Sequence, residues 1–131
     1  ERLGDLRGGE RFLAVAHSQG AAILSSALGT LSPEELERID VLTFGDAAYL
    51  FPEELHTVLR VVNVNDPVAN IFGSGAVPDW LRHSNESVLY VRFPIWFHPL
   101  EDYVEAVRFC MQFQTNCAGF YNSPESLKPE H

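Results

Sequence analysis

The stretch R-F-L-A-V-A-H-S-Q-G-A-A-I-L-S-S-A-L, residues 11–28, decides how this chain is expected to fold. It opens with an apolar run typical of a β-strand, which we expect over residues 11–16. The chain then turns sharply around Ser18. Small and apolar residues follow at helical spacing, and they predict a helix over residues 19–29. The stretch therefore predicts a strand, a tight turn that carries a serine, and a helix packed close behind the strand.

A serine on such a turn is typical of a nucleophile elbow, which exposes an attacking hydroxyl between a strand and a helix. The strained backbone of this turn requires very small residues two positions before and two positions after the serine. Ala16 and Gly20 occupy these positions, whereas the usual pattern has glycine at both. The alternative is a buried strand and helix joined by a turn that merely contains a serine, and the small residues favour the elbow.

The composition limits the class of protein. At 131 residues the chain is long enough for one domain with its own core, expected over residues 1–121, followed by a flexible polar tail over residues 122–131. Nine basic against eighteen acidic residues give a net charge of −9, which argues against nucleic acid and anionic membrane surfaces as partners. No apolar run approaches the roughly 20 residues needed to cross a bilayer, and no signal peptide is recognisable. The cellular location stays open, with a cytoplasmic one favoured.

Two cysteines occur near the end of the chain. Cys110 and Cys117 are seven residues apart, so on one helix they would lie about two turns apart, too far for a disulfide. A disulfide requires the helix to end near Gln114, and we expect two free, mostly buried thiols instead. Without neighbouring histidine pairs they form no zinc site, and the sequence points to no metal and no cofactor.

The remaining chain alternates strand-like and helix-like segments. Further strands are expected over residues 39–44, 59–64 and 87–93, the last as a candidate edge strand. A short helix is expected from Pro33 to near Ile39, capped by Ser32 and Glu35, with a helical turn over 51–55 and a loop over 71–78. A last helix is expected over 99–114, and the candidates for its core face are Tyr103, Val107, Cys110 and Met111. Such alternation predicts an α/β fold with a mostly parallel sheet and helices on both faces.

Ligands of such sheets bind beyond the carboxyl ends of the strands. Four positions follow strands directly and are expected along this rim, namely Ser18, Asp46, Asp66 and the loop that holds His98.

These residues suggest nucleophilic chemistry. A serine hydroxyl attacks well only when a histidine takes its proton and a carboxylate orients that histidine. Ser18, Asp66 and His98 follow one another in the order nucleophile, acid, base. Asp66 is preferred over Asp46 as the acid because Pro67 stiffens its turn, although a mere turn-capping role for Asp66 stays open. Asp46 is expected to bond nearby backbone.

The chain has five histidines that compete for the role of base. His98 is preferred because it begins a helix after an aromatic loop. His83, in R-H-S-N-E-S, is the main alternative. His17 adjoins the serine and is expected to pack beside the sheet, while His56 is placed on a surface helix and His131 is terminal.

Four motifs, taken in order, resemble those of the class 3 (fungal-type) lipases of the α/β-hydrolase superfamily. They are A-H-S-Q-G-A-A (16–22), V-L-T-F-G-D-A (41–47), R-V-V-N-V-N-D-P-V-A (60–69) and F-H-P-L-E-D-Y (97–103). The S-Q-G-A run is also similar to cutinases, which are small esterases of related fold. The resemblance covers about residues 12–107.

This resemblance implies a serine hydrolase that cleaves carboxylic esters through an acyl-enzyme. Ser18 would attack the ester carbonyl, His98 would act as base and then as acid, Asp66 would orient it, and the Gln19 backbone N–H would stabilise the oxyanion. The family has strands before the elbow and takes a second oxyanion donor from a loop there, and this chain shows neither. It begins at Glu1 without methionine. We therefore expect a partial fold that lacks N-terminal strands, and an isolated chain that is poorly active without that missing half.

The substrate site is expected among apolar loop residues near the rim. Phe72, Trp96 and Phe97 are the candidates for substrate contact, together with Val77, Trp80 and Ile95. They could line an acyl site or touch a lipid interface transiently, or they could be core residues that the missing half of the domain covers. A small-molecule ester or a lipid is the expected partner. The competing hypotheses are a non-catalytic hydrolase-like interaction domain and a thioesterase or peptidase on the same fold.

Overall fold

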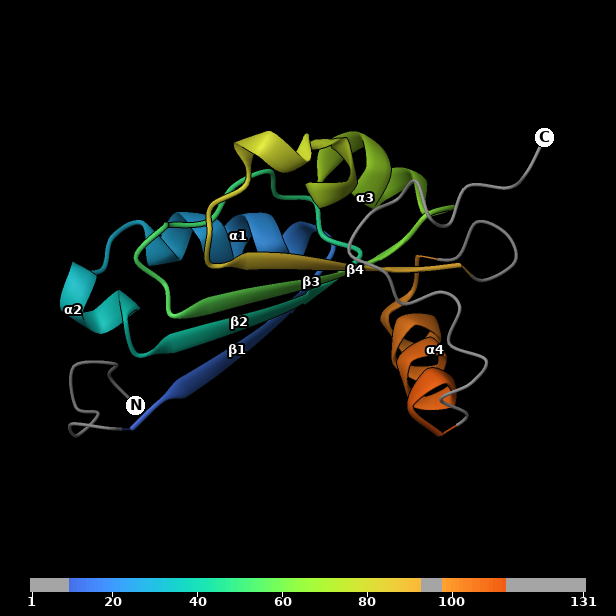
Figure 1. Cartoon of the computed structure of the whole chain (residues 1–131), viewed down its shortest axis with the longest axis horizontal. Coiled ribbons are helices and arrows are strands. Elements are labelled where there is room, and N and C mark those ends of the chain that lie inside the picture. Colours follow the sequence, from blue (N-terminus) through green and yellow to red (C-terminus); the bar gives the residue numbers. More distant parts are fainter. Residues whose placement is uncertain (1–9, 93–97, 113–131) are drawn as a thin grey trace.

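The computed structural model describes residues 10–92 and 98–112, and these residues form one parallel sheet with helices around it (Figure 1). The sheet has four strands in the order β1-β2-β3-β4, and each neighbouring pair is parallel. The strands are β1 (Phe12–His17), β2 (Ile39–Phe44), β3 (Thr57–Asn63) and β4 (Glu86–Val91). The predicted α/β class with a parallel sheet is confirmed.

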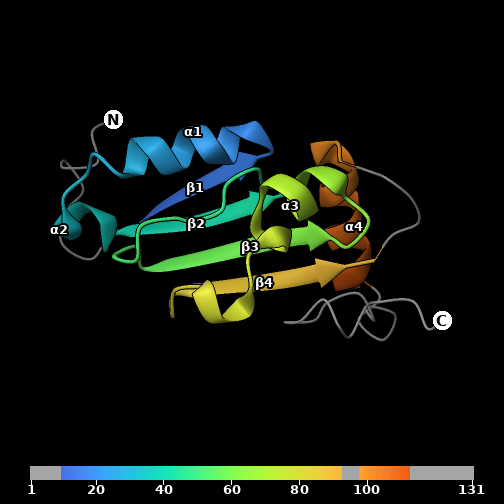
Figure 2. The ribbon, with the colours of Figure 1, turned by 90° about the horizontal axis from the view of Figure 1, so that it is seen from above.

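Helices lie on both faces of this sheet. Helices α1 (Gln19–Leu28) and α3 (Pro67–Phe72) cover one face, and α4 (Leu100–Gln112) lies on the other, near the carboxyl ends of the strands (Figure 1). Figure 2 shows α1 running beside β1, with α3 over the ends of β2 and β3. All four strands therefore end at one rim, which α1, α3 and α4 surround.

Apolar side chains pack the helices against both faces of the sheet. Under α1, the largest cluster of buried residues includes Ala14, Ala21, Val41 and Val58, and the alanines let the helix approach the sheet closely. On the opposite face, a smaller cluster is formed by Phe44, Val61, Val91 and Tyr103. Tyr103 is fully buried, so it attaches α4 to the end of the sheet where the strands stop.

The strand at the β1 edge is less well covered. Within the described residues β1 has a strand neighbour on one side only. Leu13 and Val15 are 60% and 56% exposed, although both are strongly apolar. No helix in the described part of the chain is long and apolar enough to span a bilayer.

The connections differ from expectation in several places. Helix α2 (Pro33–Leu36) has the expected capping box of Ser32 and Glu35, but it ends before Ile39. The helical turn expected over 51–55 is an irregular turn whose apolar side chains are buried.

The prediction of a loop over residues 71–78 is also wrong. It contains the end of α3 and a 3-10 turn, η2 (Ser74–Ala76), and a second turn, η3 (Asp79–Leu81), follows. The missed signal for α3 is Asp66 followed by Pro67, a cap and a first helical residue. The tail over 122–131 and Cys117 lie outside the described residues.

A buried ion network connects two strands with the loop that follows a third. The Arg60 guanidinium donates to Asp46 at 3.1 Å and to Glu86 at 3.0 Å, and the side chains of all three residues are at most 1% exposed. The same guanidinium donates to the carbonyls of Ala48 and Tyr49. Arg60 thus connects β3 with the start of β4 and with the loop that follows β2.

Replacing Arg60 should therefore be costly. We expect Arg60→Met to lower the free energy of unfolding by about 3–5 kcal/mol, because it leaves two buried carboxylates without their cation. Urea unfolding of the purified protein measures this change. The matched control is Arg11→Met, which removes a solvent-exposed pair with Asp40 and should cost less than about 1 kcal/mol. If the free energy of unfolding fell by the same small amount in both variants, Arg60 would not be the cation that stabilises the two buried carboxylates.

Candidate active site

Ser18 occupies a strained turn at the end of β1. Its backbone has φ 54° and ψ −128°, and no other non-glycine residue of the described chain has a positive φ. Such a conformation costs roughly 1–3 kcal/mol and persists only where the surroundings enforce it. The Ser18 N–H donates to the Phe44 carbonyl at 3.3 Å, and the Ala47 N–H donates to the Ser18 carbonyl at 3.0 Å. The end of β2 therefore holds the serine in its turn.

The residues two positions from Ser18 differ in what surrounds them. Ala16 is partly buried and packs against the cluster under α1. Gly20 is exposed, and a Cβ at this position would meet no atom within 4 Å. The expectation that Gly20 must be tiny is therefore wrong for the described residues, because the space beside it is open.

Three side chains far apart in the chain meet at this rim. His98 Nε2 lies 2.6 Å from Ser18 Oγ, and His98 Nδ1 lies 2.8 Å from Asp66 Oδ2. Since a carboxylate only accepts, Nδ1 carries the proton, and Nε2 of the neutral ring accepts from the serine hydroxyl. The expected convergence of Ser18, His98 and Asp66 is found. Such a chain of hydrogen bonds can move a proton away from a serine hydroxyl.

The Asp66 carboxylate is fully buried and uses its two oxygens differently. Oδ1 caps α3 by accepting from the N–H groups of Val68 at 2.9 Å and Ala69 at 3.5 Å. Oδ2 accepts from His98 and from the Tyr103 hydroxyl. Asp66 therefore does cap a turn, as the alternative for this residue expected, but only through Oδ1. Oδ2 remains available to His98.

Tyr103 fixes the far side of this carboxylate. Its hydroxyl donates to Asp66 Oδ2 and accepts from the Asn63 N–H at 3.0 Å. Burial raises the pKa of Tyr103, and the hydrogen bond to Asp66 raises it further, so the hydroxyl stays protonated as a donor. From the sequence Tyr103 is expected only on the core side of its helix. Its place five residues after His98 was the available signal for this contact.

A glycine and an asparagine side chain help to position Asp66 beside Tyr103. Gly45 has φ 53°, and a Cβ there would lie 2.7 Å from Asp66 Oδ2 and 2.7 Å from Tyr103 Cε2. The glycine that ends the T-F-G motif therefore makes room for the contact. The Asn70 side chain donates to the carbonyls of Asn63 at 3.0 Å and of Asp66 at 2.6 Å, which closes the loop that carries the carboxylate.

The first residue of α1 provides a free donor beside the serine. The Gln19 N–H donates to no backbone carbonyl of the described residues, as is usual at a helix start. The first turn of α1 contains no acidic residue that would offset its positive dipole end. A negative oxygen that develops at Ser18 would therefore find a hydrogen-bond donor and a favourable field.

The alternative acid and base lie elsewhere. Asp46 accepts from Thr43 at 2.8 Å, from Arg60, and from the Ser74 N–H at 2.8 Å, so its carboxylate belongs to the buried ion network. The backbone that it bonds is distant in sequence, not nearby as expected. His83 Nδ1 lies 3.5 Å from Glu53 and has no contact with Ser18.

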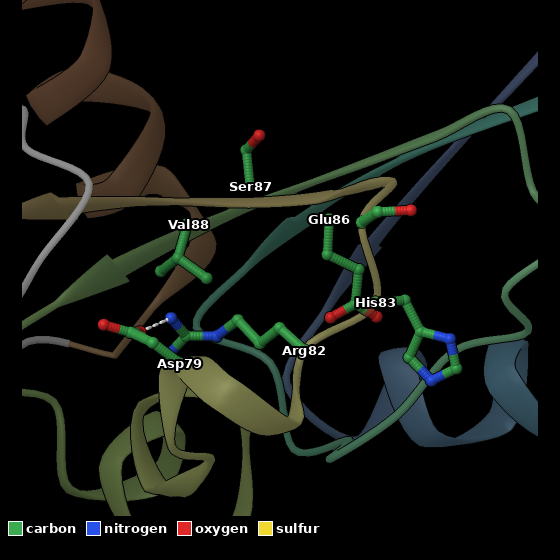
Figure 3. A pocket seen from close by; sticks show the side chains of 7 residues that line it. Asp79, Arg82, His83, Glu86, Ser87 and Val88 are labelled. Atoms are coloured by element: carbon green, nitrogen blue, oxygen red, sulfur yellow. Dashed lines mark hydrogen bonds and ion pairs between the residues drawn. The ribbon is translucent and has the colours of Figure 1, made fainter.

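His83 lines a separate cavity of about 300 Å³ at the start of β4, the opposite end of the strand from the rim (Figure 3). Its lining consists of Asp79, Arg82, His83, Ser84, Glu86, Ser87 and Val88. The Arg82 guanidinium pairs with Asp79 and donates to the carbonyls of Ser74 and Val77. The arginine of this cavity is thus engaged by the protein itself.

The candidate substrate contacts are only partly described. Phe72 is 58% exposed at the end of α3, and Trp80 is 81% exposed on η3. Val77 is 8% exposed, so it packs inside, and of the two expected roles the core one fits it. Trp96, Phe97 and Ile95 lie outside the described residues.

No group of three or more histidine, cysteine or acidic side chains in residues 10–92 and 98–112 could hold a metal ion. Comparison of the chain with family models, curated proteins and solved structures found no match.

Gly45 and Gly20 allow a matched test of the close approach at Asp66. We expect Gly45→Ala to lower the free energy of unfolding by about 2–3 kcal/mol, from positive φ and from overpacking. Gly20→Ala faces open space in a helix and should be neutral or stabilising by up to about 1 kcal/mol. Chemical denaturation measures both variants. Equal effects of the two substitutions would show that Gly45 is not confined as described.

Removing the Tyr103 hydroxyl should also reduce stability. Tyr103→Phe takes one donor from the Asp66 carboxylate and one acceptor from the Asn63 N–H, so we expect a loss of about 1–3 kcal/mol at pH 7. The measurement is the midpoint and slope of urea unfolding. No loss would mean that neither hydrogen bond contributes.

The same pair of proteins gives a pH test. Unfolded tyrosine ionises near pH 10, whereas folded Tyr103 keeps its proton there because its pKa is raised. The stability that Tyr103 contributes is therefore fully present below pH 10 and is lost as the pH rises further. The difference in unfolding free energy between wild type and Tyr103→Phe should shrink by about 1.4 kcal/mol per pH unit above 10. A constant difference from pH 9 to 11 would argue against the buried, protonated hydroxyl.

Proposed function

We propose that this protein is a serine hydrolase that cleaves carboxylic esters through an acyl-enzyme. The observation that carries the proposal is the position of His98, whose ring lies 2.6 Å from the Ser18 hydroxyl and 2.8 Å from the Asp66 carboxylate. The strained backbone of Ser18 supports it, because strain of this kind is concentrated at functional sites. The four motifs that resemble those of class 3 lipases favour esters, including lipids, as the substrate class.

The proposed reaction has two halves. Ser18 Oγ attacks the ester carbonyl carbon while His98 Nε2 takes the hydroxyl proton, and the carbonyl electrons move onto oxygen. The tetrahedral intermediate collapses, the bond to the alcohol oxygen breaks, and His98 gives its proton to that oxygen. A water molecule then attacks the acyl carbon as His98 takes its proton. The carboxylic acid leaves, and the proton returns to Ser18.

The groups around Ser18 and His98 orient the histidine and stabilise the charges that develop in the reaction. Asp66 keeps the proton of His98 on Nδ1 and stabilises the positive charge that His98 acquires. Tyr103 holds the carboxylate in place through Oδ2, and the α3 N-terminus holds Oδ1. The Gln19 N–H is the proposed oxyanion donor, and loss of one such donor typically costs roughly 10²–10³ in rate.

A fluorophosphonate probe tests the proposal, because it reacts with a serine hydroxyl that is activated as a nucleophile. We expect the intact protein to be labelled at Ser18, identified by mass spectrometry, and Ser18→Ala to be unlabelled. His98→Ala should slow labelling at least about 10³-fold, in line with removal of a catalytic base. The matched control is His83→Ala, which removes a histidine that has no contact with Ser18 and should leave the rate unchanged.

Two results would contradict the proposal. One is an intact, folded protein that is not labelled, which favours a non-catalytic interaction domain. The other is a labelling rate that falls as much in His83→Ala as in His98→Ala. Hydrolysis of esters with acyl chains of increasing length, compared with thioesters and peptides, then identifies the leaving group.

A further inference from the structure

His17, the last residue of β1, contacts the histidine of the proposed reaction in two ways. Its Nε2 lies 2.6 Å from the backbone carbonyl oxygen of His98. Its ring centroid lies 4.8 Å from that of His98, with 34° between the ring planes, and the edge of Tyr103 approaches from 6.5 Å. The expectation that His17 packs beside the sheet therefore misses a polar contact and a ring contact, both with His98.

The contact with the carbonyl determines which His17 nitrogen carries a proton. A carbonyl oxygen only accepts hydrogen bonds, so His17 Nε2 is the donor. Within residues 10–92 and 98–112, this is also the one hydrogen bond found to the main chain of His98. The side chain of His17 thus connects the His98 backbone to the end of β1.

Two consecutive residues therefore bind His98, one at its backbone and the other at its ring. His17 binds its backbone carbonyl, and Ser18 binds Nε2 of its ring. We propose that His17 is a positioning residue, which ties the main chain of His98 to the strand that carries Ser18 and so keeps the imidazole between Ser18 and Asp66. This inference rests on the proposed function, because it assigns a role within that reaction.

Substitutions at residue 17 can separate the effect of the His17 hydrogen bond from the effect of the space that its ring fills. A ring that only fills space tolerates replacement by phenylalanine, which keeps an aromatic face against His98. A donor tolerates replacement by glutamine, whose Nε2 offers an N–H at similar reach without a ring. An unsatisfied carbonyl and a freed backbone let His98 leave its place, which should lower the rate about tenfold.

The test compares His17→Phe and His17→Gln in the intact protein, using ester hydrolysis and fluorophosphonate labelling. We expect His17→Phe to lower kcat and the labelling rate about tenfold with KM changed less than twofold. His17→Gln should retain kcat within about threefold. His56→Phe is the matched control, since His56 pairs with Asp40 away from the rim and its replacement should leave kcat unchanged.

Proton NMR gives a readout that does not depend on turnover. The His98 Nδ1–H bonded to Asp66 should give a low-field exchangeable resonance in the wild type and in His17→Gln, and a weakened or shifted one in His17→Phe. A kcat and a resonance equal to wild type in His17→Phe would overturn the positioning role. So would equal losses in both variants together with equal falls in Tm, which is the result for simple packing.

The two proposals fail separately. Absence of Ser18 labelling in the folded wild type overturns the proposed function, whereas the NMR comparison of the three proteins still decides whether His17 positions His98. Labelled wild type with unaffected His17→Phe overturns the positioning role alone.

Discussion

The hydrogen bond between the buried Asp66 carboxylate and His98 is the interaction on which the rest of the rim depends. A buried charge is costly unless donors surround it, and Asp66 receives four: two N–H groups of α3, the Tyr103 hydroxyl and His98 Nδ1. These donors come from opposite faces of the sheet (Figure 1). Satisfying one carboxylate therefore fixes the positions of α3, α4 and the histidine together, and a change in any donor is expected to be felt at the histidine.

The parallel sheet makes this convergence possible. Because every strand ends at the same rim, the residues after β1, β2 and β3 come close without long connections. The strain at Ser18 is held by bonds to Phe44 and Ala47, both near the end of β2. Gly45 lies between them and leaves room for Asp66 and Tyr103. One short segment thus supports the serine on one side and the carboxylate on the other.

Much of this arrangement could be predicted from the sequence. Strand periodicity and turn residues were enough for the parallel α/β sheet, and position after a strand was enough to bring Ser18, Asp66 and His98 to one rim. The predictions that were wrong concerned contacts between residues that are close together only in the folded chain. The open surroundings of Gly20, the burial of Val77 and the engagement of Asp46 by Arg60 are set by neighbours remote in the chain. Local pattern carries no information about such neighbours.

The contacts of Tyr103 and His17 were missed for the same reason. Helical spacing placed Tyr103 on a core face, but the partner of its hydroxyl depends on how α4 docks. His17 follows the alternation of β1, and its donor meets a carbonyl 81 residues later. Polar contacts between such distant segments require the tertiary structure.

A crystal structure of the intact protein after reaction with a fluorophosphonate tests the central claim most directly. The account predicts a phosphorus atom bonded to Ser18 Oγ, its phosphoryl oxygen within hydrogen-bond distance of the Gln19 N–H, and the His98 ring still bonded to Asp66. A phosphorus atom on another residue, or an adduct at Ser18 with His98 turned away from Asp66, would contradict it.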